Sequence, residues 1–374
     1  MKLLFIFGTR PEAIKLCPVV AHLRQSGGGF KVQVCVTGQH RALLDQVLAI
    51  FRVQPDFDLD VMRAGQTLLA STSRILAGLE PVLESARPDY VVVQGDTVST
   101  FCGALAAFFL RIPVLHVEAG LRTGNLLHPF PEEANRVLTS HLTALHFPPT
   151  VDAAANLQRE GIPPERIVVT GNTGLDALLE VRRQLQTGEL PRPVWPDAWQ
   201  GKRQVLVTCH RRESFGEGIE RICDAIAQLA KRPDTQIVFP VHPNPNVQKA
   251  VAHLRALGVA LLEPQPYVEF VDLMARSHLI LTDSGGIQEE APSLGVPVLV
   301  MRETTERPEA IAAGTSRLVG TDTEKIVTEA CWLLDDATEH ERRSRTRNPY
   351  GDGHASRRIE EALLVRAPKR PANS

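Results

Sequence analysis

The segment from Leu279 to Met301 combines four features in a fixed order: a short apolar run, a glycine turn, a helix-like stretch and a second apolar run. Leu279–Leu281 is typical of a short buried strand, and Val296–Met301 is typical of the strand that follows once Gly295 has ended the helix. Strand, turn, helix and strand make a βαβ unit, with the turn at the carboxyl end of the first strand. The pattern therefore places the chain in the α/β class.

The turn of this unit, Ser284-Gly285-Gly286, has the features of a phosphate-binding site. Two glycines let a ligand approach the backbone closely, and the N–H groups and dipole of a helix start favour an anion. We expect Ser284 to cap a helix from Ile287 to about Ser293. Glu290 lies one turn into that helix, where its carboxylate can accept hydrogen bonds from ribose hydroxyls. The alternative is a glycine turn in an ordinary α/β domain.

Apolar runs followed by polar turns recur through the first half of the chain. The runs lack alternation, which favours parallel strands buried on both faces. Helix-like segments separate them, among them Ser71–Ala86 and Val98–Leu110, so the pattern predicts a doubly wound parallel sheet. The expected strands are Leu3–Phe7, Lys31–Thr37, Tyr90–Val93, Val114–Val117, Leu145–Phe147 and Ile167–Thr170.

Two carboxylates come after two of these strands. Asp96 follows Tyr90–Val93, and Glu118 follows Val114–Val117. The carboxyl ends of parallel strands face the ligand crevice of an open sheet, so acids placed there are candidates for catalysis or binding. A third acidic group, Pro131-Glu132-Glu133, is a weaker signal, because proline followed by two acids is also an ordinary helix start.

Two cations, Arg10 and Lys15, lie at and just after the helix start that follows the first strand. A turn between a strand and a helix favours anion binding at this place. The alternative is that both side chains are solvated, which is the commoner case for lysine and arginine.

The second half repeats the pattern after a linker. Gln184–Gly201 contains several prolines and glycines, the composition of a connection between domains. His210 follows the next strand and has two arginines and a glutamate beside it, which favours a site residue over a solvated or structural histidine. The expected strands are Gln204–Val207, Gln236–Val241 and Leu261-Leu262, and Tyr267–Arg276 is an expected short helix.

We therefore expect two Rossmann-like α/β domains that face each other across a cleft. Residues 1–180 form the first and carry the acids, and residues 181–352 form the second and carry the phosphate-binding turn. Residues 353–374 hold a last helix, which we expect to cross back onto the first domain.

Composition argues against several classes of protein. The formal net charge is -2, which disfavours nucleic acid as the main partner. The apolar start, Leu3–Phe7, is too short for a signal peptide, and no run approaches the roughly 20 apolar residues of a membrane span. The six cysteines are scattered without a CxxC pair, as in a reducing compartment. We expect a cytoplasmic protein that binds no metal. We also expect no bound dinucleotide, because the GxGxxG motif is absent after every expected strand.

The turns and strand ends of both halves occur in one order along the chain. They are GTRPEAIKL, TGQH, QGDT, HVEAGLRTGN, PEEANR, GNTGLDAL, CHRRESFG and TDSGGIQEEAPSLGVPVLVMRETTERPE, from Gly8 to about Arg358. In these motifs the chain resembles the non-hydrolysing UDP-N-acetylglucosamine 2-epimerases. The resemblance implies the two-domain glycosyltransferase B fold, a homodimer, and no added cofactor.

The resemblance also implies a reaction. The family interconverts UDP-N-acetylglucosamine and UDP-N-acetylmannosamine by eliminating UDP to 2-acetamidoglucal and adding it back. Such a route needs acid/base groups at both faces of C2 and a firm hold on the diphosphate. By matching positions, the acid/base carboxylates are Asp96, Glu118 and Glu132, and His210 holds the diphosphate. The positions matching substrate contacts are Arg10, Lys15, Gln265, Phe270, Ser284, Gly285, Gly286, Glu290 and Arg307.

Bacterial members of the family are often activated by their own substrate at a second site. The matching positions are Gln39, Gln46, Gln66, Arg211 and His242. One departure from the family pattern is Gln265-Pro266-Tyr267, where family members carry an acidic residue before the tyrosine-like position. Proline lacks an N–H, so the backbone cannot donate a hydrogen bond at that position.

Three other functions are compatible with the same fold, because fold alone does not decide function. A hydrolysing epimerase would release UDP and free N-acetylmannosamine, but the second-site residues argue against it. A glycosyltransferase would leave the acids of the first half without a clear purpose. A nucleotide-sugar sensor would tolerate the loss of those acids, and all of them are present.

Overall fold

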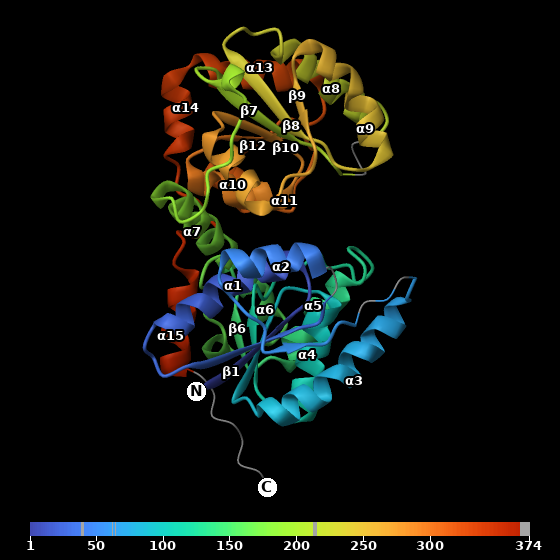
Figure 1. The fold of residues 1–374 in the computed structure, drawn as a ribbon, viewed down its shortest axis with the longest axis vertical. Helices are drawn as coiled ribbons and strands as arrows, with labels where there is room; N and C mark the ends of the chain where they lie inside the picture. The colour runs from blue at the N-terminus through green and yellow to red at the C-terminus, as the bar shows by residue number, and fades with distance from the viewer. Residues whose placement is uncertain (39–40, 62, 64, 212–214, 367–374) are drawn as a thin grey trace. The chain divides into compact units, whose positions relative to one another are not determined.

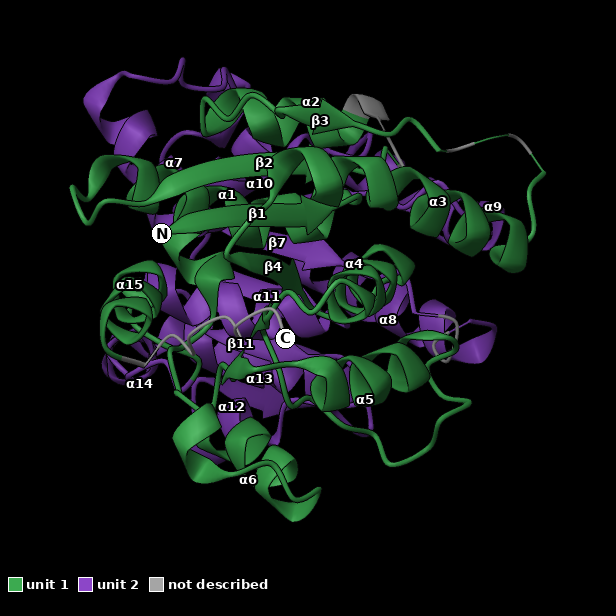
Figure 2. Ribbon diagram, turned by 90° about the horizontal axis from the view of Figure 1, so that it is seen from below, with its two compact units in different colours: residues 1–177, 350–374 green, residues 178–349 purple. Residues whose placement is uncertain are grey.

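The computed structural model describes residues 1–374 except 39, 40, 62, 64, 212–214 and 367–374 (Figure 1). The chain divides into two units, which Figure 2 distinguishes by colour. Unit 1 comprises residues 1–177 and 350–374, and unit 2 comprises residues 178–349. Each unit contains a six-stranded parallel sheet with helices around it, which confirms the predicted α/β class.

The sheet of unit 1 has the strand order β3-β2-β1-β4-β5-β6. The helices α1, α2 and α15 pack together as one layer, and α3, α4 and α5 pack together as another. The strands are β1 (Lys2–Phe7), β2 (Lys31–Val36), β3 (Phe57–Asp58), β4 (Tyr90–Gln94), β5 (Val114–Val117) and β6 (Leu145–Phe147). The helices are α1 (Arg10–Gln25), α2 (Arg41–Ile50), α3 (Leu68–Ala86), α4 (Val98–Phe109), α5 (Glu132–Leu142), α6 (Val151–Arg159), η1 (Pro164–Arg166) and α15 (Ala355–Arg366). Helix α7 (Thr173–Thr187) begins in unit 1 and continues into unit 2, which starts at Leu178.

The sheet of unit 2 has the order β12-β11-β10-β7-β8-β9. Figure 1 shows α8, α9 and α13 on one side of it, and α10 and α11 on the other. The strands are β7 (Arg203–Thr208), β8 (Thr235–Pro240), β9 (Ala260–Leu262), β10 (Leu279–Thr282), β11 (Val298–Val300) and β12 (Ser316–Leu318). The helices are η2 (Asp197–Trp199), α8 (Glu217–Leu229), α9 (Pro245–Val251), η4 (Ala252–Leu257), α10 (Tyr267–Arg276), α11 (Gly285–Glu290), η5 (Ala291–Leu294), α12 (Pro308–Ala313), α13 (Thr323–Asp335) and α14 (Ala337–Ser344).

The central strands are apolar throughout because helices cover both faces of each sheet. In β1, every side chain from Leu3 to Phe7 is fully buried. In unit 2, Leu279 and Leu281 of β10 belong to a core cluster that also contains Ile226 of α8 and Leu333 of α13. Burial on both faces explains why these strands could be located from hydrophobicity alone.

Three sequence expectations about the secondary structure need correction. Ile167–Thr170 is not a strand, since Ile167 forms only an isolated bridge with His146. The predicted linker begins too early, because α7 continues to Thr187. The helix after the glycine turn ends at Glu290, and a 3-10 turn completes the segment as far as Leu294.

The last helix, α15, belongs to unit 1 although unit 2 precedes it in the chain. It packs against α1, as the red and blue helices in Figure 1 show. His22 of α1 and Glu360 of α15 are within hydrogen-bond distance, with Nε2 and Oε2 2.7 Å apart. On α7, Asp176 accepts hydrogen bonds from the backbone N–H groups of Ala355 and Ser356 at the start of α15.

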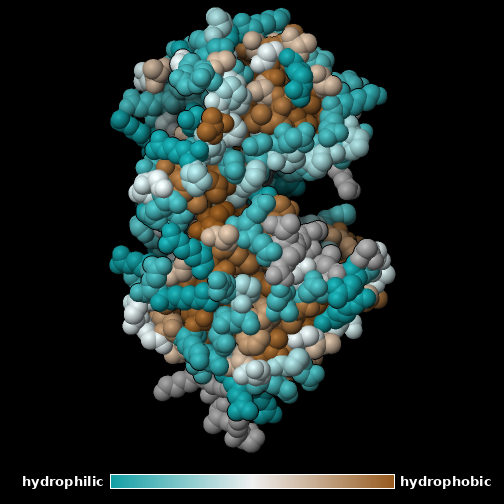
Figure 3. Space-filling model, in the orientation of Figure 1, coloured by the Kyte–Doolittle hydropathy of each residue, from teal (hydrophilic) through white to brown (hydrophobic). Residues whose placement is uncertain are grey.

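The surface face in Figure 3 is mainly hydrophilic, with hydrophobic residues between the polar ones. Among the described helices, none combines the length and the hydrophobicity that crossing a membrane requires.

Candidate functional site

The two sheets share one topology, which sets the places where a ligand can bind. In each sheet the first strand of the unit lies beside its fourth: β1 pairs with β4, and β7 pairs with β10. The connections on the two sides of such a pair run in opposite directions, so a crevice opens at the carboxyl ends of these strands. Asp96, His210 and Ser284 lie in the loops that follow β4, β7 and β10, and Arg10 begins the helix that follows β1.

Asp96 follows β4 in unit 1, and α5 holds it. Arg136 of α5 forms an ion pair with the Asp96 carboxylate, and the Asn135 amide donates to the Asp96 carbonyl oxygen at 2.9 Å. Burial raises the pKa of Asp96, against the lowering effect of Arg136, and the charge of Glu118 raises it further. A carboxyl group that gives up its proton less readily than usual suits proton transfer near neutral pH.

Glu118 follows β5, the neighbour of β4 in the sheet. Lys15 and the amide of Gln94 both donate hydrogen bonds to its carboxylate. The backbone of Glu118 has φ +59°, a left-handed conformation that residues with a side chain rarely adopt. Such strain is retained where the surrounding structure enforces it, often at functional sites. The sequence placed Asp96 and Glu118 at equivalent strand ends, and the structure brings them to adjacent strands.

A buried histidine supports the turn that carries Asp96. His116 of β5 is fully buried, and its Nε2 lies 2.8 Å from the carbonyl oxygen of Gly95. Burial lowers the pKa of His116 to about 3, so the ring is neutral, and the contact with a carbonyl places its proton on Nε2. Gly95 itself has φ +71°, which suits a glycine at this turn.

The acidic pair at the start of α5 divides into two different environments. Glu132 is partly exposed in the first turn of α5. Its neighbour Glu133 is buried and forms an ion pair with Arg136, Nη1 to Oε2 at 3.1 Å. Glu133 also accepts hydrogen bonds from the backbone N–H groups of Thr123 and Gly124. The sequence selected Glu132 for catalysis and gave no role to Glu133.

The loop after β1, which carries Arg10, is fixed by a capping box at the start of α1. The Thr9 hydroxyl accepts a hydrogen bond from the Glu12 N–H, and the Glu12 carboxylate accepts from the N–H groups of Gly8 and Thr9. Burial raises the pKa of Glu12, and the hydroxyl of Thr97, after β4, donates to it. Glu12 thus ties the loop after β1 to the turn after β4.

In unit 2, His210 follows β7 and contacts a buried carboxylate after β10. Its Nδ1 lies 3.1 Å from Oδ1 of Asp283, whose other oxygen accepts the backbone N–H groups of His210 and Arg211, both at 2.7 Å. Burial opposes ionisation of Asp283, but these donors hold its pKa below the ordinary value. Asp283 therefore fixes the ring nitrogen that faces the protein and leaves Nε2 for a ligand.

The glycine turn follows β10 as predicted, with one difference. Ser284 occupies the N-cap position of α11, but its side chain makes no capping hydrogen bond, so the predicted cap is wrong. The free hydroxyl and the exposed Gly286 lie at the helix start, where an anion is favoured. Arg307 lies beside this turn, since an added Cβ on Gly285 would be 3.6 Å from its guanidinium carbon.

Arg307 and Glu290 were both predicted to contact substrate. The Arg307 guanidinium forms an ion pair with Glu289 of α11, a residue that the sequence did not select. Glu290 follows it and is partly exposed. Gln265 and Phe270 lie before and within α10, both partly exposed, and the Gln265 amide donates to the Glu263 carbonyl oxygen at 2.7 Å.

The residues predicted for a second ligand site are spread over both units. Gln39 lies outside the described residues, Gln46 is exposed on α2, and Gln66 accepts a hydrogen bond from Arg74. In unit 2, the ring of His242 stacks on that of His210 with centroids 5.7 Å apart. Arg211 directly follows His210 in the sequence and is partly buried. The structure thus brings His242 and Arg211 to the neighbourhood of His210.

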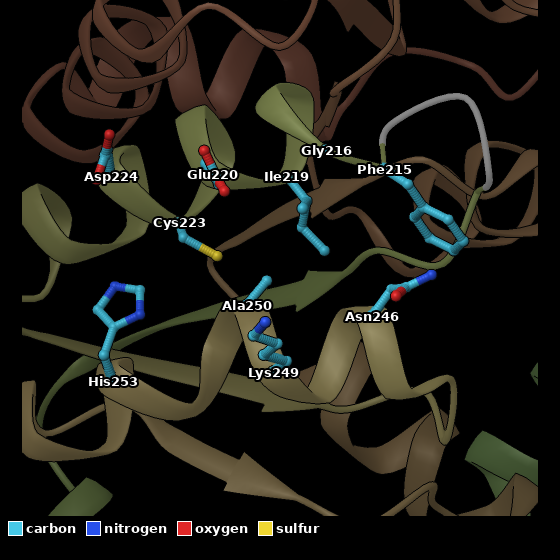
Figure 4. A pocket seen from close by; sticks show the side chains of 10 residues that line it. All are labelled: Phe215, Gly216, Ile219, Glu220, Cys223, Asp224, Asn246, Lys249, Ala250 and His253. Carbon is cyan, nitrogen blue, oxygen red and sulfur yellow. The ribbon is translucent and has the colours of Figure 1, made fainter.

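A separate cavity of about 640 Å³ lies between α8 and the segment formed by α9 and η4 (Figure 4). Glu220 and Asp224 of α8 lie across it from Lys249 of α9 and His253 of η4. Burial raises the pKa of Cys223 in its wall to about 12, so that thiol is not a nucleophile at neutral pH. None of the predicted site residues lines this cavity.

Five residues of the site were not selected from the sequence. Some of them carried a signal: Arg136 lies three positions after Glu133 in the PEEANR motif, and Asp283 directly precedes Ser284. A polar residue at the last position of a buried strand, such as Gln94, is a further signal. The missed residues are Gln94, Glu133, Arg136, Asp283 and Glu289.

Two parallel sheets, each with charged groups and turns at its switch point, define a two-domain α/β protein of the glycosyltransferase B type. A family model described as UDP-N-acetylglucosamine 2-epimerase matches residues 22–364. The UDP-N-acetylglucosamine 2-epimerase of Salmonella typhimurium is 56% identical over 372 residues, which cover 97% of this chain and 98% of that protein. The chain belongs to the UDP-N-acetylglucosamine 2-epimerase family.

Solved structures agree with this assignment. The crystal structure of UDP-GlcNAc 2-epimerase from Neisseria meningitidis bound to UDP-GlcNAc is 49% identical, with a TM-score of 0.85 over 97% of this chain and 100% of that chain. The glycosyltransferase SnogD from Streptomyces nogalater is 19% identical, with a TM-score of 0.58 over 97% of this chain and 99% of that one. The second likeness shows the fold alone.

Proposed function

We propose that the protein interconverts UDP-N-acetylglucosamine and UDP-N-acetylmannosamine without hydrolysis. The observation that carries the proposal is the pair Asp96 and Glu118, which follow adjacent parallel strands and are each paired with a different cation. Two carboxylates in unlike surroundings are what a reaction with two proton transfers at one carbon needs.

The proposed reaction has two halves. In the first half, a carboxylate removes the proton from C2 of the sugar, and the electrons of the C2–H bond form the C1–C2 double bond. The C1–O bond breaks and its electrons leave with UDP, so the sugar becomes 2-acetamidoglucal. A UDP oxygen then adds back to C1, and an acid delivers a proton to the opposite face of C2. Asp96, Glu118 and Glu132 are the candidate acid/base groups, and unit 1 supplies all three.

Unit 2 supplies the groups proposed to hold the leaving nucleotide. Ser284, Gly285 and Gly286 present a helix start, His210 presents Nε2, and Arg307 adds a guanidinium. Cations and N–H dipoles stabilise the charge that grows on a departing diphosphate. We assign Glu290 to the ribose, and Gln265, Phe270, Arg10 and Lys15 to further nucleotide contacts.

The alternative is a hydrolysing enzyme, in which water takes the place of the returning UDP. Both enzymes need the same carboxylates, so the residues of unit 1 alone do not separate them. Proton NMR of the protein with UDP-N-acetylglucosamine in deuterated water does. We expect UDP-N-acetylmannosamine with deuterium at C2 and no free sugar, whereas free N-acetylmannosamine and UDP would establish the hydrolysing reaction. An unchanged spectrum from folded protein would reject both.

We also propose that UDP-N-acetylglucosamine activates the enzyme at a second site that includes Arg211 and His242. The stacking of His242 on His210 supports a connection between that site and the diphosphate. UDP-N-acetylmannosamine alone should react slowly until a trace of UDP-N-acetylglucosamine is added. A constant rate from the first seconds would reject activation.

We further propose that the protein is a homodimer. Phe108 and Phe109 at the end of α4 are 54% and 70% exposed, and Leu138 of the neighbouring helix α5 is 50% exposed. Large apolar side chains exposed together favour a protein interface. Light scattering after gel filtration should give twice the chain mass, and a Phe108→Ser/Phe109→Ser variant should give the mass of one chain. A monomeric wild-type protein at micromolar concentration would reject the proposal.

A further inference from the structure

Glu133 and Asp96 share one guanidinium. Arg136 directs Nη1 to Oε2 of Glu133 at 3.1 Å and Nη2 to Oδ2 of Asp96. We propose that Glu133 is a positioning residue that holds Arg136 against Asp96 and takes up part of its charge. This inference rests on the proposed function, in which Asp96 transfers a proton, and extends it to a residue that need not touch the substrate.

The first support is the burial of Glu133. Its side chain is 1% exposed, so its charge needs partners within the protein. The two oxygens have separate partners: Oε1 accepts from the N–H groups of Thr123 at 2.9 Å and Gly124 at 3.0 Å, and Oε2 accepts from Arg136. Glu133 therefore anchors the loop after β5 with one oxygen and Arg136 with the other.

The second support is the way α5 holds Asp96. Arg136 contacts its carboxylate, and Asn135 of the same helix turn donates to its backbone carbonyl at 2.9 Å. A guanidinium held by a buried carboxylate on one side presents its other nitrogen in a fixed direction. The position of Asp96 then depends on Glu133 through Arg136.

Because Arg136 contacts both carboxylates, the charge of Glu133 affects the pKa of Asp96 in a predictable direction. The charged groups acting on Asp96 are Arg136 of α5, Glu118 after β5 and Lys15 of α1. Burial raises the pKa of Asp96, and Arg136 lowers it. Glu133 offsets part of the positive charge of Arg136, so removing the charge of Glu133 leaves more of it to stabilise the Asp96 carboxylate. The pKa of Asp96 should then fall.

The test is Glu133→Gln in the full chain. Glutamine keeps a carbonyl oxygen for the N–H groups of Thr123 and Gly124 but places an NH₂ group toward Arg136, so the loop anchor survives and the charge is removed. The matched control is Glu160→Gln. Glu160 is paired with Arg122 of the same loop, at 2.7 Å in two hydrogen bonds, and does not share Arg136.

The first readout is the carboxyl carbon signal of Asp96, titrated by NMR in protein with ¹³C-labelled aspartate and assigned with Asp96→Asn. We expect the pKa of Asp96 to fall by about 1 unit in Glu133→Gln and to stay unchanged in Glu160→Gln. An unchanged pKa in a folded Glu133→Gln protein would overturn the inference. This measurement does not depend on enzymatic activity, so it tests the inference even if the proposed function is wrong.

The second readout is the pH profile of kcat/KM for epimerisation. A shift of the limb assigned to Asp96, by the amount that NMR reports, supports a positioning role. A uniform loss at every pH, with unchanged limbs, shows a structural role and overturns the inference. Wild-type protein without epimerase activity would reject the proposed function alone.

A second pair of variants keeps the test open if Glu133→Gln does not fold. The double variant Glu133→Gln/Arg136→Gln removes both partners, so it leaves no unpaired buried charge and should fold. Without the guanidinium only the direct repulsion between the two carboxylates remains, so the pKa of Asp96 should differ less between Arg136→Gln and the double variant than between wild type and Glu133→Gln. A difference as large as the one expected between wild type and Glu133→Gln would show that Glu133 acts without Arg136, and would overturn the inference.

Discussion

Lys15, in the second turn of α1, forms an ion pair with Glu118, which lies 103 residues further along the chain. The lysine was selected from the sequence as a nucleotide contact, whereas this pair gives it a second task, the orientation of a carboxylate. The two tasks predict different kinetics. Loss of a substrate contact made equally in the ground and transition states raises KM, whereas loss of the orientation of a catalytic group lowers kcat.

Lys15→Met should therefore lower kcat by about 10²-fold, with a smaller effect on KM. Steady-state kinetics measure both constants, and Lys31→Met at the exposed start of β2 is the control for the loss of one lysine charge. A large rise in KM with kcat unchanged would show that Lys15 contributes to nucleotide binding alone.

Asp96→Asn should abolish exchange of the C2 proton, with a loss of at least about 10²-fold, because asparagine cannot accept or deliver the proton. Since burial raises the pKa of Asp96 above its ordinary value of 3.8, the wild-type limb assigned to Asp96 should also lie above that value. Deuterium incorporation at C2, followed by proton NMR, measures the exchange. Asp152→Asn on the exposed start of α6 should exchange like wild type.

Ser284→Ala should weaken UDP binding without lowering stability. The Ser284 side chain makes no capping hydrogen bond to α11, so its removal costs the fold little. A lost hydrogen bond to a charged phosphate should raise the Kd for UDP by about 10-fold or more. Titration calorimetry measures the affinity and thermal unfolding measures the stability.

Thr150→Ala is the matched control for that substitution. The Thr150 hydroxyl caps α6 by accepting the Ala153 N–H at 3.1 Å. Its loss should lower the free energy of unfolding by about 1 kcal/mol and leave UDP affinity unchanged. If Ser284→Ala destabilised the protein as much as Thr150→Ala, Ser284 would be a structural residue.

Asp283→Asn should lower stability by about 1–3 kcal/mol, because a buried acceptor of two backbone N–H groups loses a charged oxygen. The folded-state pKa of Asp283 lies below its ordinary value of 3.8, so its contribution is complete above that value and is lost as the pH falls through the folded-state pKa. The difference in Tm between wild type and variant should be constant from pH 6 to 8 and shrink below about pH 4.

Asp322→Asn offers the comparison for that pH series. Asp322 caps α13 by accepting the Lys325 N–H at 2.8 Å, and asparagine caps a helix about as well as aspartate. Its Tm at neutral pH should stay close to that of wild type. A gap between wild type and Asp283→Asn that widened in acid would contradict the assigned direction of the pKa.

The buried strands and their polar ends could be predicted because both signals are local. Leu3–Phe7 and Leu279–Leu281 are apolar over consecutive positions, and the sheets contain both runs. The edge strands β3 (Phe57-Asp58) and β12 (Ser316-Arg317-Leu318) contain charged residues and are not apolar runs, so they give no such signal. Ile167–Thr170 has the signal but only one bridge partner, so hydrophobicity alone misled the assignment.

The candidate site could be predicted in its positions but not in its pairings. The sequence shows that four candidate residues follow apolar runs expected to be strands: Asp96, Glu118, His210 and Ser284. Which cation each acid meets depends on helices distant in the chain, and a sequence pattern does not carry that information. The choice between Glu132 and Glu133 fails for a related reason: neighbours on a helix point about 100° apart, and only the packing of α5 decides which one meets Arg136.

The position of α15 bears on how the protein is made. A ribosome delivers the chain from its amino terminus, and residues 1–177 emerge long before residues 350–374, which complete the same unit. Unit 2 is one continuous segment and has all its strands and helices before α15 leaves the ribosome. During synthesis the later half of the chain can finish its fold first, while the earlier half still exposes the face of α1 that α15 will cover.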